Sequence, residues 1–147
     1  MATIQDLLSS TQKFKPKLFK NARGPKLVTL RITRFKGTRT LLFTGTSKDP
    51  ATQNLRTVQM QFVAPPDVDI QEFRPSIFKD RVLVRCSSPW YKYAFGYNNK
   101  RIKAQFGRVS TFRVKGTGRP VNPKNFPGVD KHLISMIRAL IATGSIR

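Results

Sequence analysis

Acidic residues are scarce in this chain. Seven Asp and Glu stand against 28 Lys and Arg, which gives a formal net charge of +21 over 147 residues. Between Asp6 and Asp49 there are eleven basic residues and no acid, and the same is true between Asp80 and Asp130. A surface of this kind repels itself and attracts anions. The charge therefore predicts an anionic partner: nucleic acid, an acidic protein or an anionic membrane.

Cysteine and long apolar runs are also scarce. The chain has one cysteine, Cys86, which excludes an intrachain disulfide and hence a disulfide-stapled secreted module. Its longest apolar stretch, residues 133–141, is interrupted by Ser135 and Arg138. That stretch is far shorter than the roughly 20 residues that cross a bilayer. Residues 1–20 lack the apolar segment of a signal peptide, so we expect neither secretion nor a membrane anchor.

Catalytic patterns are missing as well. The sequence has no paired carboxylates, no Ser-His-Asp order and no dinucleotide fingerprint, and Gly116-Thr117-Gly118 lacks the Gly-Lys-Ser/Thr ending of a phosphate loop, so it is predicted to be a turn. Cys86 and His132 are the possible nucleophile and base, but a buried cysteine and a packed histidine are the more common roles. We expect no enzyme and no cofactor.

The pattern of apolar residues predicts an α+β fold: a small antiparallel sheet, arranged as a meander, with an N-terminal helix and arm and a C-terminal helix. Thr3 is expected to cap a helix that carries Ile4 and Leu7 on one face and ends before Pro16. A basic arm follows. We therefore divide the chain into a helix and arm at residues 1–26 and a single α+β domain at residues 27–147.

The domain itself is predicted from strand and helix periodicity. In the first strand Val28, Leu30 and Ile32 alternate with polar residues, which gives it one apolar face. Asp130 is expected to cap the terminal helix, residues 128–143. Strands are expected at residues 27–35, 40–45, 57–63, 81–86 and 109–114.

Two segments carry a resemblance to a known module. Residues 82–93 (VLVRCSSPWYKY) and 122–133 (NPKNFPGVDKHL) resemble the two halves of a SWIM-type zinc module, which has Cys-x-Cys at a strand end and Cys-x-His at a helix start. At the four ligand places this chain has Cys86, Ser88, Asp130 and His132. Two thiolates are missing from the tetrahedral set that zinc prefers. The resemblance therefore implies a vestigial site without metal in a retained strand–loop–helix frame, residues 82–140.

This degenerate module, joined to an N-terminal helix and a meander, resembles structural proteins of tailed-phage virions. The resemblance implies a virion component, assembled in the host cytoplasm, in the head, neck, tail or baseplate. Its partners would be acidic shell or tail subunits in a symmetric assembly of many copies, with packaged DNA as a further contact and no membrane.

The residues expected to bind the acidic partner are basic and lie in the arm or in the second acid-free segment. They are Lys13, Lys15, Lys17, Lys20, Arg23, Lys100, Arg101, Lys103, Arg108, Arg113, Lys115 and Arg119. Trp90, Tyr91 and Tyr93 are expected as aromatic residues of the interface or core, since the aromatic residues from Tyr91 to Tyr97 alternate at strand period.

Nucleic-acid binding remains the alternative. The net charge alone fits a ribosomal-like or genome-packaging protein. The aromatic cluster near Trp90, followed by Lys100, Arg101 and Lys103, also fits stacking on the bases of a single strand.

Overall fold

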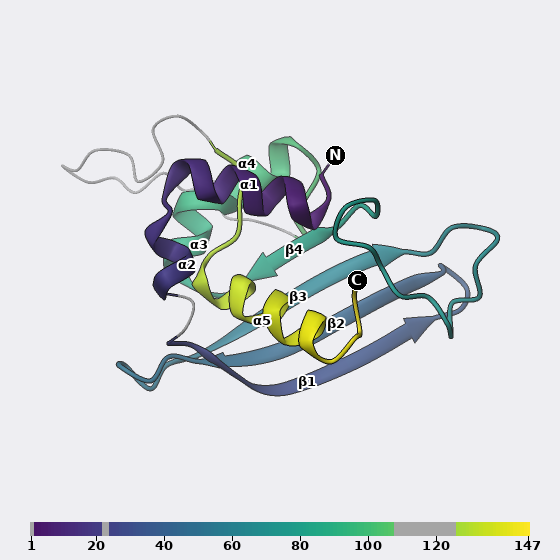
Figure 1. The fold of residues 1–147 in the computed structure, drawn as a ribbon, viewed down its shortest axis with the longest axis horizontal. Coiled ribbons are helices and arrows are strands. Elements are labelled where there is room, and N and C mark those ends of the chain that lie inside the picture. The colour runs from purple at the N-terminus through teal and green to yellow at the C-terminus, as the bar shows by residue number, and fades with distance from the viewer. Residues whose placement is uncertain (1, 22–23, 108–125) are drawn as a thin grey trace.

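The computed structural model of this chain describes residues 2–21, 24–107 and 126–147 (Figure 1). The predicted strand at residues 109–114 and the predicted turn at residues 116–118 lie outside these ranges. So do five of the expected binding residues, which are Arg23, Arg108, Arg113, Lys115 and Arg119.

The described residues form an α+β fold, as the sequence predicted. The helices are α1 (Ile4–Phe14), α2 (Lys17–Asn21), α3 (Pro89–Tyr91), the π-helical η1 (Lys92–Gly96), α4 (Tyr97–Arg101) and α5 (Lys131–Ala142). The strands are β1 (Lys26–Phe35), β2 (Thr40–Lys48), β3 (Leu55–Val63) and β4 (Leu83–Cys86). They form one sheet in the order β1-β2-β3-β4, in which every neighbouring pair is antiparallel. The predicted meander is therefore confirmed.

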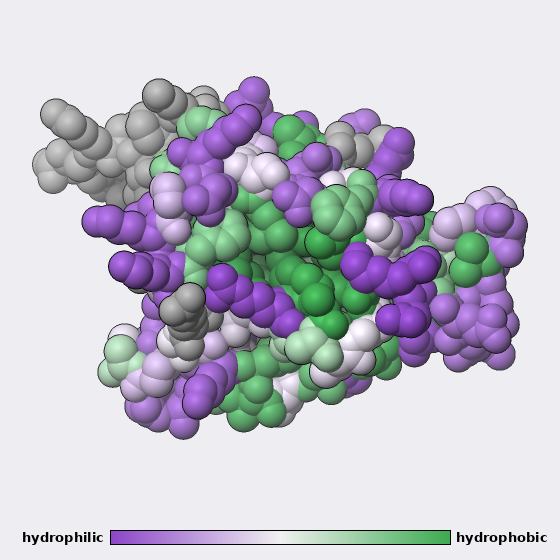
Figure 2. All heavy atoms as spheres, viewed as in Figure 1, coloured by the Kyte–Doolittle hydropathy of each residue, from purple (hydrophilic) through white to green (hydrophobic). Residues whose placement is uncertain are grey.

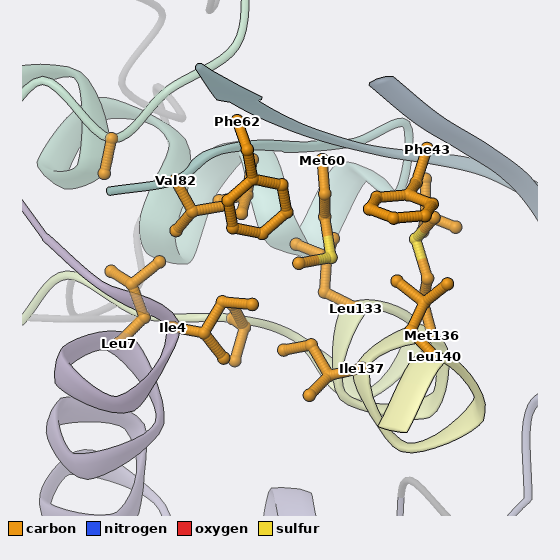
Figure 3. Close-up of a cluster of buried hydrophobic side chains, with 14 of the residues drawn as sticks. Ile4, Leu7, Phe43, Met60, Phe62, Val82, Leu133, Met136, Ile137 and Leu140 are labelled. Carbon is orange, nitrogen blue, oxygen red and sulfur yellow. The ribbon is translucent and has the colours of Figure 1, made fainter. Parts of the chain in front are cut away.

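One face of the sheet forms the core. Alternate residues of β2 and β3, including Phe43, Met60 and Phe62, are buried, while the residues between them are partly exposed. Helix α5 contacts all four strands. Its buried side chains, among them Leu133 and Ile137, point toward the sheet side chains in Figure 3. The sheet thus has one face covered by a helix and one face built from Thr, Gln, Arg and a few apolar residues.

Helix α1 is part of this core. Thr3 and Asp6 form a reciprocal capping box, as the Thr3 hydroxyl accepts from the Asp6 N–H at 3.2 Å and the Asp6 carboxylate from the Thr3 N–H at 3.0 Å. Ile4 and Leu7 are fully buried in the cluster that contains the sheet residues. The helix predicted within residues 1–26 thus packs into the same core as residues of the domain predicted at 27–147. Leu18 of α2 is also buried, so the arm is anchored by two short helices.

The first strand departs from its predicted burial. Val28, Leu30 and Ile32 are 56%, 37% and 39% exposed. The register places Leu30 opposite Gly45 and Ile32 opposite Phe43, so both side chains lie on the core face of the sheet. They remain partly exposed because β1 is an outer strand, with no further strand beside it in the described residues, although α5 also contacts β1.

The aromatic segment is helical, so its predicted strand-like alternation is wrong. Residues 89–101 form α3, η1 and α4. Tyr91, Ala94, Phe95, Asn98 and Asn99 are buried, and their spacing of three and four residues is that of one helix face. Helical period, not strand period, therefore decides which residues of this segment enter the core.

Buried polar side chains connect the helical segment to the start of α5. The Asn99 amide donates to the Gly128 carbonyl at 2.8 Å and accepts from the Gly128 N–H at 2.9 Å. It also donates to the Tyr91 hydroxyl, which donates to Gln105 at 2.6 Å. One residue further, the Val129 N–H donates to the Thr11 hydroxyl of α1 at 2.9 Å. Residues 128–129 are therefore held between α1 and the helical segment.

Candidate basic docking surface

The few acids of this chain mostly bind its own backbone. Carboxylates accept hydrogen bonds from backbone N–H groups in five cases: Asp6 from Thr3, Asp49 from Ala51, Asp69 from Gln71, Asp80 from Ser76, and Asp130 from Leu133. Asp49 also pairs with Lys131 at 2.5 Å, and this contact lowers the pKa of Asp49. Acids that cap turns and helices neutralise little of the distant surface charge. The basic surface is thus left for an external anion.

The expected binding residues of the arm lie together at the corner of α1 and α2. Lys13, Lys15, Lys17 and Lys20 are all exposed. A shallow pocket of about 360 Å³ opens here, lined by Gln12, Pro16, Lys17, Phe19, Lys20 and Arg138. No acid lines this pocket. We call Lys13, Lys15, Lys17, Lys20 and Arg138 the basic corner.

Arg138 is a member of the basic corner that the sequence analysis did not select. It comes from α5, and its guanidinium donates to the carbonyl of Phe19 in α2 at 3.2 Å. The signal was present in the sequence, since Arg138 interrupts the apolar run of the terminal helix. In Figure 2, hydrophilic side chains frame an apolar hollow between α1 and α5 on this face of the molecule.

The end of α1 is fixed by aromatic contacts. The rings of Phe14 and Phe95 pack edge to face, with 5.6 Å between the ring centres. The Lys15 ammonium lies 5.3 Å from the centre of the Trp90 ring, a distance at which the ring face attracts a cation. Because Lys15 belongs to the basic corner, Trp90 lies beside this surface, and its side chain is partly exposed there. The basic corner is therefore attached to rigid elements of the fold.

The other expected residues divide into three groups. Lys100, Arg101 and Lys103 are exposed at and just after the end of α4, so they are also available to a partner. Tyr91 is fully buried, and its hydroxyl is bonded inside the chain, so of its two predicted places, interface or core, it lies in the core. The side chain of Tyr93 lies outside the described parts of the chain.

The vestigial zinc positions do not assemble a metal site in the described residues. The backbone N–H of Ser88 donates a hydrogen bond to the Cys86 sulfur at 3.4 Å. Asp130 accepts from the Leu133 N–H at 2.9 Å as the cap of α5, as predicted. His132 Nδ1 is paired with the Ser47 hydroxyl at 2.8 Å. No group of three or more His, Cys, Asp or Glu side chains suited to a metal occurs in these ranges.

Cys86 and His132 have the properties of packed residues. Burial raises the pKa of the Cys86 thiol well above its usual value, and the neighbouring Asp130 charge raises it further. A protonated thiol is a weak nucleophile. Burial also lowers the pKa of His132, so its imidazole is neutral at pH 7. His132 is thus the hydrogen-bonded packing residue that the sequence analysis favoured.

The buried carboxyl of Asp130 predicts a pH-dependent stability. Burial raises the pKa of Asp130 above 3.8, although its bond to the Leu133 N–H lowers it. A carboxyl whose pKa is raised in the folded state destabilises the protein as pH rises through that pKa. Asn keeps the capping oxygen and cannot ionise. We therefore expect Asp130→Asn to be more stable than the wild type at pH 7, and the gap to close below about pH 4.

Thermal unfolding of both proteins between pH 3 and 7 measures this gap. Titrating groups that do not interact with Asp130 are common to the two proteins and cancel in the comparison. The Asp130 charge also raises the pKa of His132 and of Cys86, so the changed titration of these two groups is part of the measured difference. A wild type that is the more stable protein at pH 7 would show that the ionised carboxylate is favoured at the start of α5.

Comparisons with known proteins gave no match. No family model matches the chain, and neither the curated proteins nor the solved structures include a significant match. In the part of the chain that the structure describes, no helix is both long and apolar enough to cross a membrane.

Proposed function

We propose that this chain is a non-enzymatic assembly protein that docks its basic corner on an acidic neighbouring subunit, as a structural component of a tailed-phage virion. The observation that carries the proposal is the basic corner itself. Lys17, Lys20 and Arg138 line one pocket where α2 meets α5, and no acid lines that pocket. Lys13 and Lys15 are exposed at the adjoining end of α1. Fixed cations without an internal counter-charge favour an acidic partner.

The virion part of the proposal is supported by the resemblance of residues 82–93 and 122–133 to a degenerate SWIM-type module. The fold is consistent with the frame of that module. Strand β4 ends at Cys86 and helix α5 begins directly after Asp130, which are the places where the ligand pairs of the module stand. Docking of many copies in a symmetric particle would then cover the exposed lysines with acidic surface.

Nucleic-acid binding is favoured by one contact, the partly exposed Trp90 beside Lys15. An aromatic ring next to cations is typical of surfaces that stack bases and bind phosphates. The salt dependence separates the two functions. A protein that makes 6–10 phosphate contacts loses about 10³–10⁵ in affinity for duplex DNA between 50 and 200 mM salt.

The experiment compares poly-glutamate with duplex DNA of equal charge, by fluorescence anisotropy of the labelled polyanion at 50 and 200 mM salt. We expect the full chain to bind poly-glutamate at both salt concentrations. At 200 mM salt, we expect it to bind DNA no more tightly than it binds poly-glutamate. Failure to bind poly-glutamate would contradict docking on an acidic protein. Binding of DNA that is tighter than binding of poly-glutamate, and that has the salt dependence given above, would favour the nucleic-acid function instead.

A further inference from the structure

The two outer strands of the sheet differ in how their free edges are covered. At β4, the Val84 N–H donates to the Ala104 carbonyl at 2.7 Å, and the Phe106 N–H donates to the Val84 carbonyl at 2.8 Å. The segment around Gln105 thus pairs with β4 in parallel. At the opposite side, β1 pairs with β2 and with no other segment of the described residues.

The uncovered edge of β1 is long and regular. The strand has ten residues, and its one register shift lies between Leu27 and Thr29, near its start. From Thr29 to Phe35 each residue has a single partner in β2. Natural edge strands are usually kept short or interrupted, because a long row of unpaired N–H and C=O groups is a template for another strand. From Thr29 to Phe35 this row is neither short nor interrupted, and its protection is charge, from the exposed Arg31 and from Arg34, whose guanidinium donates to the Ile70 carbonyl at 3.1 Å.

Exposed apolar side chains accompany the free edge. Leu30 and Ile32 lie on the core face of β1, and both are more than a third exposed. Phe35, on the other face, is 46% exposed. A strand added beside β1 would place its own side chains next to these and would remove apolar surface from water. The edge therefore offers both backbone hydrogen bonds and apolar contact.

The charge around the edge selects the kind of strand that fits. Lys26 and Arg31 of β1 are exposed, and Lys26 pairs with the exposed Lys48 of β2. The sequence has no acid from residue 7 to residue 48. A second copy of this chain would bring the same cations against this edge, and like charges on adjacent strands destabilise pairing. A strand that alternates acidic and apolar residues satisfies both the charge and the apolar row.

We propose that β1 receives a strand of alternating acidic and apolar residues from a partner protein, which extends the sheet by one strand. This inference rests on the proposed docking of an acidic partner and specifies one way in which that partner attaches. The affinity would come from main-chain hydrogen bonds, and the selectivity from the side chains that flank them.

The test uses two synthetic peptides with the sequence (Glu-Val)₄, one of them N-methylated at every residue. The two carry the same charge, but the methylated peptide has no backbone N–H group to donate along either edge. We expect the unmethylated peptide to bind the full chain at least about tenfold more tightly at 150 mM salt, since several main-chain hydrogen bonds are lost on methylation. We also expect the peptide to slow hydrogen exchange of the amides in residues 29–35.

A paired set of variants locates the binding site on the chain. The double variant Leu30→Thr and Ile32→Thr keeps β-forming residues at exposed positions, and we expect it to weaken binding of the unmethylated peptide severalfold. Leu55→Thr, on β3 and 59% exposed, is the matched control and should leave binding unchanged.

The outcomes separate this inference from the proposed function. Equal binding of the two peptides, together with binding of poly-glutamate, would overturn strand addition and leave acidic docking intact. If neither peptide nor poly-glutamate binds, both proposals fail. Dimerisation of the free chain through residues 29–35, seen by sedimentation and hydrogen exchange, would show that a second copy occupies the edge and would also overturn the inference.

Discussion

Leu7→Ala is expected to lower the free energy of unfolding by about 2–5 kcal/mol, as is typical when a buried leucine is truncated in a packed core. Leu7 is fully buried, and it lies on the face of α1 that also buries Ile4. The cavity would open between α1 and the sheet, because Leu7 belongs to the same cluster as the sheet residues. Denaturant unfolding, monitored by circular dichroism, measures the loss.

A second residue of α1 provides the control. Gln12 is exposed on the same helix, so Gln12→Ala should change the free energy of unfolding by less than about 0.5 kcal/mol. If Leu7→Ala is as mild as Gln12→Ala, then α1 is an accessory segment and the chain has the separate arm that its sequence suggested.

The burial of α1 changes how the basic corner should be understood. A free arm would become ordered only upon assembly and would lose conformational entropy at that moment. Here Leu18 of α2 is itself buried, and the Thr11 hydroxyl of α1 accepts from the Val129 N–H, so the backbone that carries Lys13, Lys15 and Lys17 starts from a fixed position. A preorganised charged surface loses less entropy on binding. The basic corner therefore resembles a formed interface more than a tail.

Elements with a strong local pattern were predictable from the sequence. The Thr3 cap and the Pro16 stop bound α1, and the alternation of Val58, Met60 and Phe62 defines β3. In α5, Asp130 caps the helix as expected. In each case the signal comes from neighbouring residues in the chain, and local propensity and burial agree.

The remaining features depend on contacts between distant segments. The exposure of Leu30 and Ile32 follows from the place of β1 in the sheet, which alternation does not reveal. Similarly, the arrangement of Arg138 beside Lys17 and Lys20 requires α5 to pass α2, over a separation of more than one hundred residues in the chain. Sequence alone identified the lysines, and the fold determines which of them share a surface.

Neutralising the basic corner should have the largest effect on assembly. In the triple variant Lys13→Gln, Lys17→Gln and Lys20→Gln, three exposed cations are lost, and among the described residues these ammonium groups form no hydrogen bond that would break. Each ion pair at a surface contributes up to about 1 kcal/mol. Three such pairs therefore amount to roughly a hundredfold in affinity for the acidic partner. The stability of the chain should remain unchanged.

A variant of equal charge serves as the control. Lys36, Lys79 and Arg85 are also exposed, and their joint replacement by glutamine lowers the net charge by the same amount, away from the basic corner and from the Lys26–Lys48 pair beside the β1 edge. Both variants should unfold at the wild-type temperature. A difference between them in binding then reports position and not total charge.

The most direct test is the copy number of each variant in purified phage particles, counted by quantitative mass spectrometry in the presence of wild-type competitor. The account predicts that the control variant is incorporated like the wild type, while the Lys13, Lys17 and Lys20 variant is nearly excluded. Equal incorporation of the two variants, or absence of the wild-type chain from the particle, would contradict it.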